Sequence, residues 1–505
     1  MTYTIEKITT LIGARRYGDR DSNVGFILTD SRSLCFPEET LFFALQSERN
    51  DGHNYIPELY RRGVRNFVVS QVPKGYASDY PEANFLKVVN TLEALQRLAE
   101  RHRDEFNIPI VGITGSNGKT MVKEWLHQLL SPELFVTRSP RSYNSQIGVP
   151  LSVWLLNEQT QLGVFEAGIS QPGEMLALRD IIQPTIAVLT YLGAAHQENF
   201  ESLEAKCREK IILFHDAETI VYNGDDETVS GVVNEYQDYK GEKLYWSFKD
   251  PQAPFFVKNV EKKGNLSIIT YIYKGEEDSY SLPFIDEASV TNSIIAAVVS
   301  RRLGLSAENL DKRMALLEPV AMRLEVKEGQ HGCTLINDSY NSDINSLDIA
   351  LDFMSRRPDH KGRRHTLILS DIFQSGESPK DLYREVSDLC RKRGVVKFIG
   401  IGPQLCEQSN EIQISEKFFF GNVEEFIDSE VFKSLRDEVI LLKGARQFGF
   451  DQLTELLVKK VHETTLEVNL NAVVANLNYY RSFMKPHTKL VCMIKADGYG
   501  AGAVE

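Results

Sequence analysis

A glycine-rich loop between an apolar strand and a helix constrains this chain more than any other segment. The loop, Val111–Thr120, is V-G-I-T-G-S-N-G-K-T; Ile108–Thr114 is predicted as a buried strand and Lys119–Leu130 as a helix. Glycines let backbone N–H groups turn toward phosphate oxygens, and a helix N-terminus adds positive potential there. The segment predicts a phosphate-binding loop, with Lys119 directed at the β- and γ-phosphates and the Thr120 hydroxyl at Mg²⁺.

The glycine spacing differs from the strict G-x-x-x-x-G-K-[ST] pattern, which would require a glycine at Ile113. A plain glycine-rich turn is the alternative, and the strand–loop–helix context favours an ATP site instead. The residues expected to hold the nucleotide here are Gly115, Ser116, Asn117, Gly118, Lys119 and Thr120.

Apolar runs alternate with helical patterns along most of the chain, which is typical of α/β proteins with parallel sheets. We predict four parts: a first domain over 1–106, a central ATP-binding domain with a parallel sheet over 107–317, a Rossmann-like domain over 318–460 and a tail over 461–505.

Composition narrows the function further. The 505 residues are 42% hydrophobic and 25% charged, with a net charge of −13, which argues against a nucleic-acid partner. No apolar run approaches the roughly 18–20 residues of a membrane span, and the first residues lack the pattern of a secretory signal. The six cysteines form no C-x-x-C pair, which fits a reducing compartment. We expect a cytoplasmic, multidomain enzyme without a membrane span.

Further motifs accompany the loop along the chain. D-S-R from Asp30 precedes the loop. The motifs that follow it are, in order, N-x-x-I-G-V-P from Asn144, E-x-G from Glu166, G-x-A-H ending at His196 and D-S-Y-N from Asp338. Together with the loop, this series resembles the Mur ligase family over residues 20–457. The D-S-R segment resembles the nucleotide-sugar domain of one branch of the family.

The resemblance implies a three-domain ligase that uses ATP and Mg²⁺. A substrate carboxylate is phosphorylated and the acyl phosphate is then attacked by an amine; the implied substrates are UDP-N-acetylmuramoyl-tripeptide and D-alanyl-D-alanine. Two alternatives stay open: a ligase of similar architecture such as a folylpolyglutamate synthase, and a non-catalytic ATP-binding scaffold.

Three residues are metal-ligand candidates from their types and positions. Taken alone, Glu166 reads as a solvated strand-end charge and His196 as a hydrogen-bonded loop histidine. Oxygen ligands at the ends of parallel strands suit Mg²⁺. The resemblance implies that Thr120 and Glu166 bind one Mg²⁺ and that His196 lies near a second.

A lysine falls on an apolar helix stripe. Leu203, Cys207, Lys210 and Phe214 are spaced to share one helix face, which should face the core. Spacing alone leaves two equal alternatives for Lys210: a buried neutral amine, or a buried stem with the ammonium in water. The resemblance implies a carbamylated lysine that binds the second Mg²⁺. Lys206 is expected to be exposed.

Other candidates depend on the resemblance. Pattern alone favours a turn cap for the D-S-R segment, and a surface charge pair is an open alternative for the strand-end Lys443 and Arg446. The implied substrate residues are Asp30, Ser31, Arg32, Asn144, Tyr340, Asn341, Lys443 and Arg446. Those implied to hold or close over the nucleotide are Asn292, Arg323 and Asp338. This chain has Ala288 and Ser289 where many members carry a His-Asn pair beside the adenine.

The tail carries a separate resemblance. Lys489–Gly500 is K-L-V-C-M-I-K-A-D-G-Y-G and is similar to the opening of alanine racemase, in which the lysine of a K-A-x-x-Y-G motif holds pyridoxal phosphate as a Schiff base. Lys495 is that lysine here. A (β/α)₈ barrel needs about 250 residues, far more than 467–505. We therefore expect a natural ligase–racemase fusion, of which this chain holds the ligase and an inactive stub that does not bind pyridoxal phosphate.

Overall fold

The structure is a computed structural model. It describes residues 2–47, 50–193, 199–236, 239–320, 324–339, 343–356, 362–373, 378–445 and 448–459, with isolated residues between 473 and 491. Across these residues, none of the helices combines the length and apolarity needed to cross a membrane. Chain contacts divide the protein into two compact units, 1–98 with 461–505, and 99–460.

The first unit is built on a five-stranded sheet in the order β2-β7-β6-β5-β4. Neighbours from β4 to β7 are parallel, and β2 is antiparallel to β7. The strands are β2 (Arg15–Tyr17), β4 (Phe26–Leu28), β5 (Thr40–Phe43), β6 (Asn66–Val69) and β7 (Asn84–Lys87); a small pair is formed by β1 (Tyr3–Thr4) and β3 (Asn23–Val24). The helices are α1 (Ile5–Leu11), α2 (Ile56–Arg61), α3 (Tyr76–Asp79) and α4 (Thr91–Arg103), of which α4 continues into the second unit.

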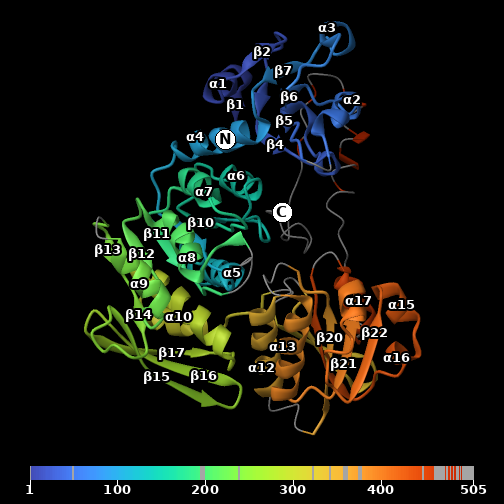
Figure 1. The fold of residues 1–505 in the computed structure, drawn as a ribbon. Helices are drawn as coiled ribbons and strands as arrows, with labels where there is room; N and C mark the ends of the chain where they lie inside the picture. Colours follow the sequence, from blue (N-terminus) through green and yellow to red (C-terminus); the bar gives the residue numbers. More distant parts are fainter. Residues whose placement is uncertain are drawn as a thin grey trace. The chain divides into compact units, whose positions relative to one another are not determined.

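The second unit begins with a six-stranded parallel sheet in the order β13-β12-β11-β8-β10-β9 (Figure 1). The strands are β8 (Ile110–Thr114), β9 (Val136–Arg138), β10 (Leu162–Glu166), β11 (Ile186–Leu189), β12 (Thr219–Val221) and β13 (Glu242–Lys243). The inner strands are buried along their whole length, as expected for a parallel sheet covered on both faces.

Helices cover both faces of this sheet. One core holds α5 (Lys119–Leu130), α10 (Glu287–Arg302) and α11 (Ala307–Met314). The other holds α6 (Gly148–Val153), α7 (Glu174–Ile182), α8 (Leu203–Ile211) and α9 (Glu227–Glu235). A four-stranded sheet of β14 (Trp246–Ser247), β15 (Phe255–Lys263), β16 (Leu266–Tyr273) and β17 (Glu276–Leu282) packs into the first core.

A second six-stranded sheet follows, in the order β18-β19-β23-β20-β21-β22, with β18 antiparallel and the other neighbours parallel. Its strands are β18 (Glu325–Glu328), β19 (Thr334–Asn337), β20 (Arg364–Ser370), β21 (Lys397–Ile401), β22 (Glu416–Phe420) and β23 (Glu438–Lys443). One face packs on α12 (Ile344–Arg356), α13 (Pro379–Lys392) and α14 (Pro403–Glu407), and the other on α15 (Val423–Asp428), α16 (Glu430–Lys433) and α17 (Phe450–Leu457) (Figure 1).

The connection between the two large sheets is anchored on α5. The indole Nε1 of Trp125 donates to the backbone oxygen of Glu318 at 3.1 Å, and the Glu318 N–H donates to Gln128 Oε1 at 3.0 Å. Because Trp125 is 1% exposed, the connection begins at a fixed point on the helix that follows the phosphate loop.

The predicted α/β fold class with parallel sheets is confirmed. The strand before the loop runs Ile110–Thr114, and the helix after it spans Lys119–Leu130, as expected. The boundaries at 106, 317 and 460 stay predictions, and most of the tail lies outside the described residues.

Candidate nucleotide-binding site

The glycine-rich loop follows the central strand β8 and depends on left-handed backbone at two glycines. Gly115 has φ +144° and Gly118 has φ +90°. A Cβ at Gly115 would lie 2.0 Å from Thr190 Oγ1, and one at Gly118 would lie 2.4 Å from Asn292 Oδ1. Both positions therefore exclude side chains, which leaves backbone N–H groups free to approach a ligand closely.

The segment after β11 holds the loop in place. Ser116 N–H donates to the Tyr191 oxygen at 2.6 Å, and Thr190 Oγ1 donates to the Asn117 oxygen at 2.6 Å. The Ser116 hydroxyl donates to the Gly193 oxygen at 3.0 Å and accepts from Gly193 N–H at 2.9 Å. These four hydrogen bonds hold the loop in a defined conformation.

Lys119 folds back over the loop that it follows. Its Nζ lies 2.7 Å from the Gly115 oxygen and 3.2 Å from the Ser116 oxygen. Phosphate oxygens in the loop could replace these carbonyl acceptors, because an ammonium on a flexible stem can rotate toward a new partner.

Thr120 and Glu166 meet beside the loop. Thr120 Oγ1 donates to Glu166 Oε2 at 3.1 Å and lies 3.1 Å from the Ser142 hydroxyl. Both are oxygen donors, the kind that Mg²⁺ prefers together with substrate phosphates. The pair therefore fits a metal that arrives with a nucleotide. Within the described parts of the chain, no three His, Cys, Asp or Glu side chains cluster as a metal site.

The alternative of a solvated Glu166 is wrong, because Glu166 is 0% exposed. Its other oxygen, Oε1, lies 3.1 Å from Nζ of Lys123, which is also fully buried. Sequence analysis missed Lys123; the signal was its spacing, one helical turn after Lys119 on the same face.

Two buried lysines of α8 approach the loop. Lys210 Nζ donates to the Gly115 oxygen at 3.3 Å, and Lys206 Nζ donates to the Gly193 oxygen at 2.5 Å. Lys210 is 2% exposed, so the alternative with its ammonium in water is wrong. The expectation that Lys206 is exposed is also wrong, because the Lys206 residue is only 1% exposed. Lys206 lies on α8 one turn before Lys210, next to the apolar stripe of this helix, and this side of the helix is covered as well.

Burial changes the acid–base chemistry of both amines. It lowers the pKa of Lys210 well below its ordinary value, and the neighbouring charges of Lys119 and Lys206 lower it further. It also lowers the pKa of Lys206 to about 8, against an opposing effect of Asp343. A neutral amine is therefore available near the phosphate loop, as the first alternative for Lys210 expected.

A cavity of about 610 Å³ extends from the loop between α10 and the part of the chain that holds the six-stranded sheet of β18 to β23. Its lining includes Asn292 on one side and Leu324, Asp338 and Ile349 on the other. Asn292 lies against Gly118, so the structure brings this predicted nucleotide residue to the loop.

An ion pair joins the ends of β19 and β23 on this side of the cavity. Lys443 Nζ lies 2.6 Å from Asp338 Oδ2, and Lys443 is fully buried. The alternative of a surface charge pair at Lys443 is therefore wrong; its carboxylate partner is the D-S-Y-N aspartate.

Asn144 lies in the loop before α6 and against the E-x-G motif. A Cβ at Gly168 would lie 2.9 Å from Asn144 Cγ, and Gly168 N–H donates to the Asn144 oxygen at 2.8 Å. Both residues line the cavity, so the structure joins two of the predicted motifs near the phosphate loop.

In the first unit, the D-S-R segment forms a turn at the end of β4. Asp30 accepts from the Arg32 N–H at 3.0 Å and pairs with its guanidinium at 2.6 Å, while the Ser31 oxygen accepts from Arg62 at 2.8 Å. The hydrogen bonds from Arg32 lower the pKa of the Asp30 carboxyl. The turn cap favoured by the pattern is what the structure contains; the substrate role stays a prediction.

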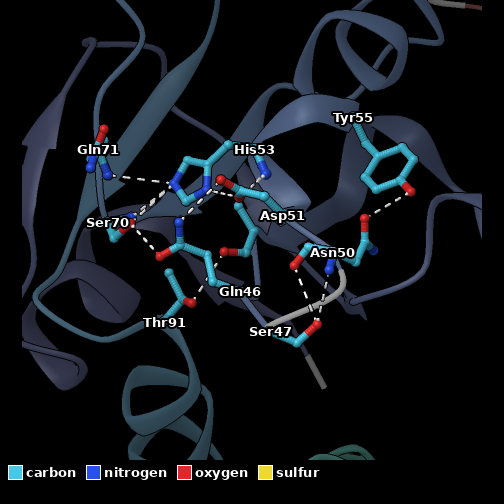
Figure 2. A network of polar contacts seen from close by, with 10 residues as sticks. Gln46, Ser47, Asn50, Asp51, His53, Tyr55, Ser70, Gln71 and Thr91 are labelled. Atoms are coloured by element: carbon cyan, nitrogen blue, oxygen red, sulfur yellow. Dashed lines mark hydrogen bonds and ion pairs between the residues drawn. The ribbon is translucent and has the colours of Figure 1, made fainter.

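A polar network lies at the same edge of that sheet (Figure 2). His53 Nδ1 lies 2.7 Å from Asp51 Oδ1, and His53 Nε2 accepts from the Ser70 N–H at 3.1 Å. Gln46 joins the network by donating to Asp51 Oδ2 at 3.1 Å and accepting from the Ser70 hydroxyl at 3.2 Å. The residues come from the loops after β5 and β6, where parallel α/β sheets collect binding groups.

The network fixes one form of the histidine. Because backbone N–H groups point at Nε2 of His53, that nitrogen carries a lone pair and Nδ1 donates to Asp51. The backbone N–H of His53 in turn holds the pKa of Asp51 below its ordinary value. The result is a rigid polar surface beside the D-S-R turn.

Six predicted site residues lie outside the described residues: His196, Arg323, Tyr340, Asn341, Arg446 and Lys495. Their roles stay predictions.

The fold and the loop define a phosphate-loop nucleotide-binding protein of the α/β class. Residues 113–300 match the profile of the Mur ligase middle domain. The UDP-N-acetylmuramoyl-tripeptide–D-alanyl-D-alanine ligase of Bacillus subtilis is 27% identical over 366 residues, covering 71% of this chain and 76% of that protein. The Escherichia coli protein of the same name is 24% identical over 468 residues, covering 90% and 98%.

Solved structures share the fold over most of the chain. MurF from Acinetobacter baumannii superposes with a TM-score of 0.76 at 21% identity, covering 90% of this chain and 99% of that one. MurF from Thermotoga maritima in complex with ADP gives 0.71 at 21% identity, covering 85% and 96%. A folylpolyglutamate synthase from Mycobacterium tuberculosis gives 0.57 at 13% identity, covering 72% and 94%. Residues 113–300 are thus similar to the Mur ligase middle domain, and the fold is shared with these ligases over most of the chain.

We expect Lys206 to make folding stability depend on pH. Below pH 8 the amine is charged in both states; between about 8 and 10 the folded state loses the proton and the unfolded state keeps it. The unfolded state then binds more protons, so stability rises with pH relative to Lys206→Met. Urea denaturation at pH 7 to 10 measures this, with exposed Lys262→Met as the control. Parallel pH profiles for wild type and Lys206→Met would contradict the expectation.

Proposed function

We propose that the chain is an ATP-dependent ligase that joins D-alanyl-D-alanine to UDP-N-acetylmuramoyl-tripeptide. One observation carries the proposal: the glycine-rich loop has an oxygen pair suited to Mg²⁺ beside it, Thr120 with Glu166, and the buried amines of Lys206 and Lys210 also approach it. The support for the particular substrates is the activity named for the Bacillus subtilis and Escherichia coli relatives, which align along 71% and 90% of the chain.

The reaction has two steps, a phosphoryl transfer and the formation of an amide bond. A carboxylate oxygen of the tripeptide attacks the γ-phosphorus of ATP, and ADP leaves. The amine of D-alanyl-D-alanine then attacks the acyl carbon, phosphate leaves, and the amine loses a proton. Mg²⁺ at Thr120 and Glu166 would offset the charge on the phosphates. ATP and a UDP-linked precursor as substrates imply a cytoplasmic enzyme.

The chain's own groups have distinct tasks in this scheme. The loop N–H groups and Lys119 bind and orient the phosphates, which is most of what phosphoryl transfer requires. Asn292 and the cavity that extends from α10 toward the sheet of β18 to β23 receive the rest of the nucleotide. We assign the UDP group to the edge of the first sheet, where the D-S-R turn and the His53 network lie.

The proposed activity is tested by ADP release from the purified chain. We expect turnover only when UDP-N-acetylmuramoyl-tripeptide and D-alanyl-D-alanine are both present. Lys119→Ala should lose at least about a hundredfold in rate, because a charged phosphate contact made in the transition state is removed. Turnover that continues without either substrate would overturn the assignment, and glutamylation of a folate would indicate the folylpolyglutamate synthase alternative.

We also propose that Lys210 is carbamylated when the enzyme is active. A carbamate forms when a neutral amine attacks CO₂ and loses a proton; burial supplies the neutral amine by lowering the pKa of Lys210. His196 and this carbamate would then hold the second Mg²⁺.

For Lys210→Ala we expect loss of ligation, with partial recovery when a short carboxylic acid is added to fill the space. Mass spectrometry with ¹³C-bicarbonate measures the modification directly. Full activity of Lys210→Ala, with normal melting, would leave Lys210 as a structural lysine only.

We propose finally that the K-A-D-G-Y-G segment is the start of a racemase-like barrel, and that the natural protein is a ligase–racemase fusion. The support is the sequence motif alone. We expect the 505-residue chain to show no stoichiometric visible absorption band with added pyridoxal phosphate and no alanine racemisation. A stoichiometric band that disappears in Lys495→Ala would prove this wrong.

A further inference from the structure

Lys123 has a role that the proposed function does not use. It lies on α5 one turn after Lys119, and its side chain is fully buried. Its Nζ contacts four oxygens: the Ser139 oxygen at 2.9 Å, the Arg141 oxygen, Glu124 Oε1 at 2.9 Å and Glu166 Oε1 at 3.1 Å. An ammonium this deeply buried is stable only because carboxylates and carbonyls surround it.

The two oxygens of the Glu166 carboxylate have different partners. Oε1 faces the Lys123 ammonium, and Oε2 accepts from the Thr120 hydroxyl beside the phosphate loop. A metal at Thr120 and Glu166 would therefore bind a carboxylate whose negative charge is already partly neutralised by the Lys123 ammonium.

Lys123 also shapes the loop in front of the metal position. It binds the carbonyls of Ser139 and Arg141, and Arg141 has the left-handed φ of +49°. The next residue, Ser142, places its hydroxyl 3.1 Å from Thr120 Oγ1. One ammonium thus fixes both the carboxylate and the loop.

We propose that Lys123 is a positioning residue that makes metal binding at Thr120 and Glu166 conditional on a bound nucleotide. The inference rests on the proposed nucleotide site. Mg²⁺ gives up its water reluctantly and usually binds through one or two carboxylates plus substrate phosphates. With Glu166 offset by Lys123, the empty site attracts a dication weakly, and the nucleotide phosphates supply the missing negative charge.

Mn²⁺ binding to the purified chain, followed by electron paramagnetic resonance with and without ADP, tests the proposal. We expect wild type to bind Mn²⁺ at least about tenfold more tightly with ADP, within the usual range of coupling between two ligands. Lys123→Met should bind Mn²⁺ without ADP about tenfold more tightly than wild type does. The double variant Lys123→Met/Glu166→Gln should lose that gain.

Reciprocity supplies a second readout, because Mn²⁺ must tighten ADP binding by the same factor that ADP tightens Mn²⁺ binding. Lys123→Arg keeps the charge and should retain the wild-type coupling, and thermal melting reports whether each variant is folded. Wild-type coupling in a folded Lys123→Met would overturn the proposal.

If Lys123→Met does not fold, the measurement on the wild-type protein tests the proposal by itself. Equal Mn²⁺ affinity of the wild-type protein with and without ADP would also overturn the proposal. Failure of ADP to bind at all would instead reject the nucleotide site. Coupling without any ligation would reject only the proposed substrates.

Discussion

The parallel register of three strands determines where the chemistry of this protein can occur. In the central sheet β8 pairs with β10 so that Ile113 lies opposite Glu166, and with β11 so that Thr114 lies opposite Leu189. The three strands therefore end together. The phosphate loop, the metal-ligand candidate and the segment that holds the loop all begin within a residue or two of this edge, which explains why residues far apart in sequence contact each other there.

The edge is unusually rich in buried amines. Lys123, Lys206 and Lys210 are all at most 2% exposed, and Lys119 folds over the loop between them. A cluster of amines in a poorly hydrated place favours an anionic ligand. Burial, together with neighbouring positive charges, lowers the pKa of Lys206 and of Lys210. The overall charge of −13 hides this local excess, so net charge alone would have given the wrong impression of the ligand.

Sequence predicted the parts of the site that depend on local pattern. The loop, its strand and its helix follow from glycine spacing and apolar runs. The apolar stripe placed Lys210 on the core-facing side of its helix but left open whether its amine is buried, and the structure buries it. Prediction from the sequence failed where the burial of a side chain depends on elements that are distant in sequence. Lys206 lies on the flank of the stripe, and Lys123 finds Glu166 only because β10 pairs with β8.

The anchoring of Glu318 on Trp125 and Gln128 has a mechanical consequence. The helix α5 carries the phosphate loop at its first turn and the departure point of the third domain near its last turns. At 1.5 Å per residue, those points are about 10–15 Å apart on one rigid rod. The start of the segment after Glu318 is therefore positioned by the same helix that begins at the phosphate loop, and not by the strands of the sheet.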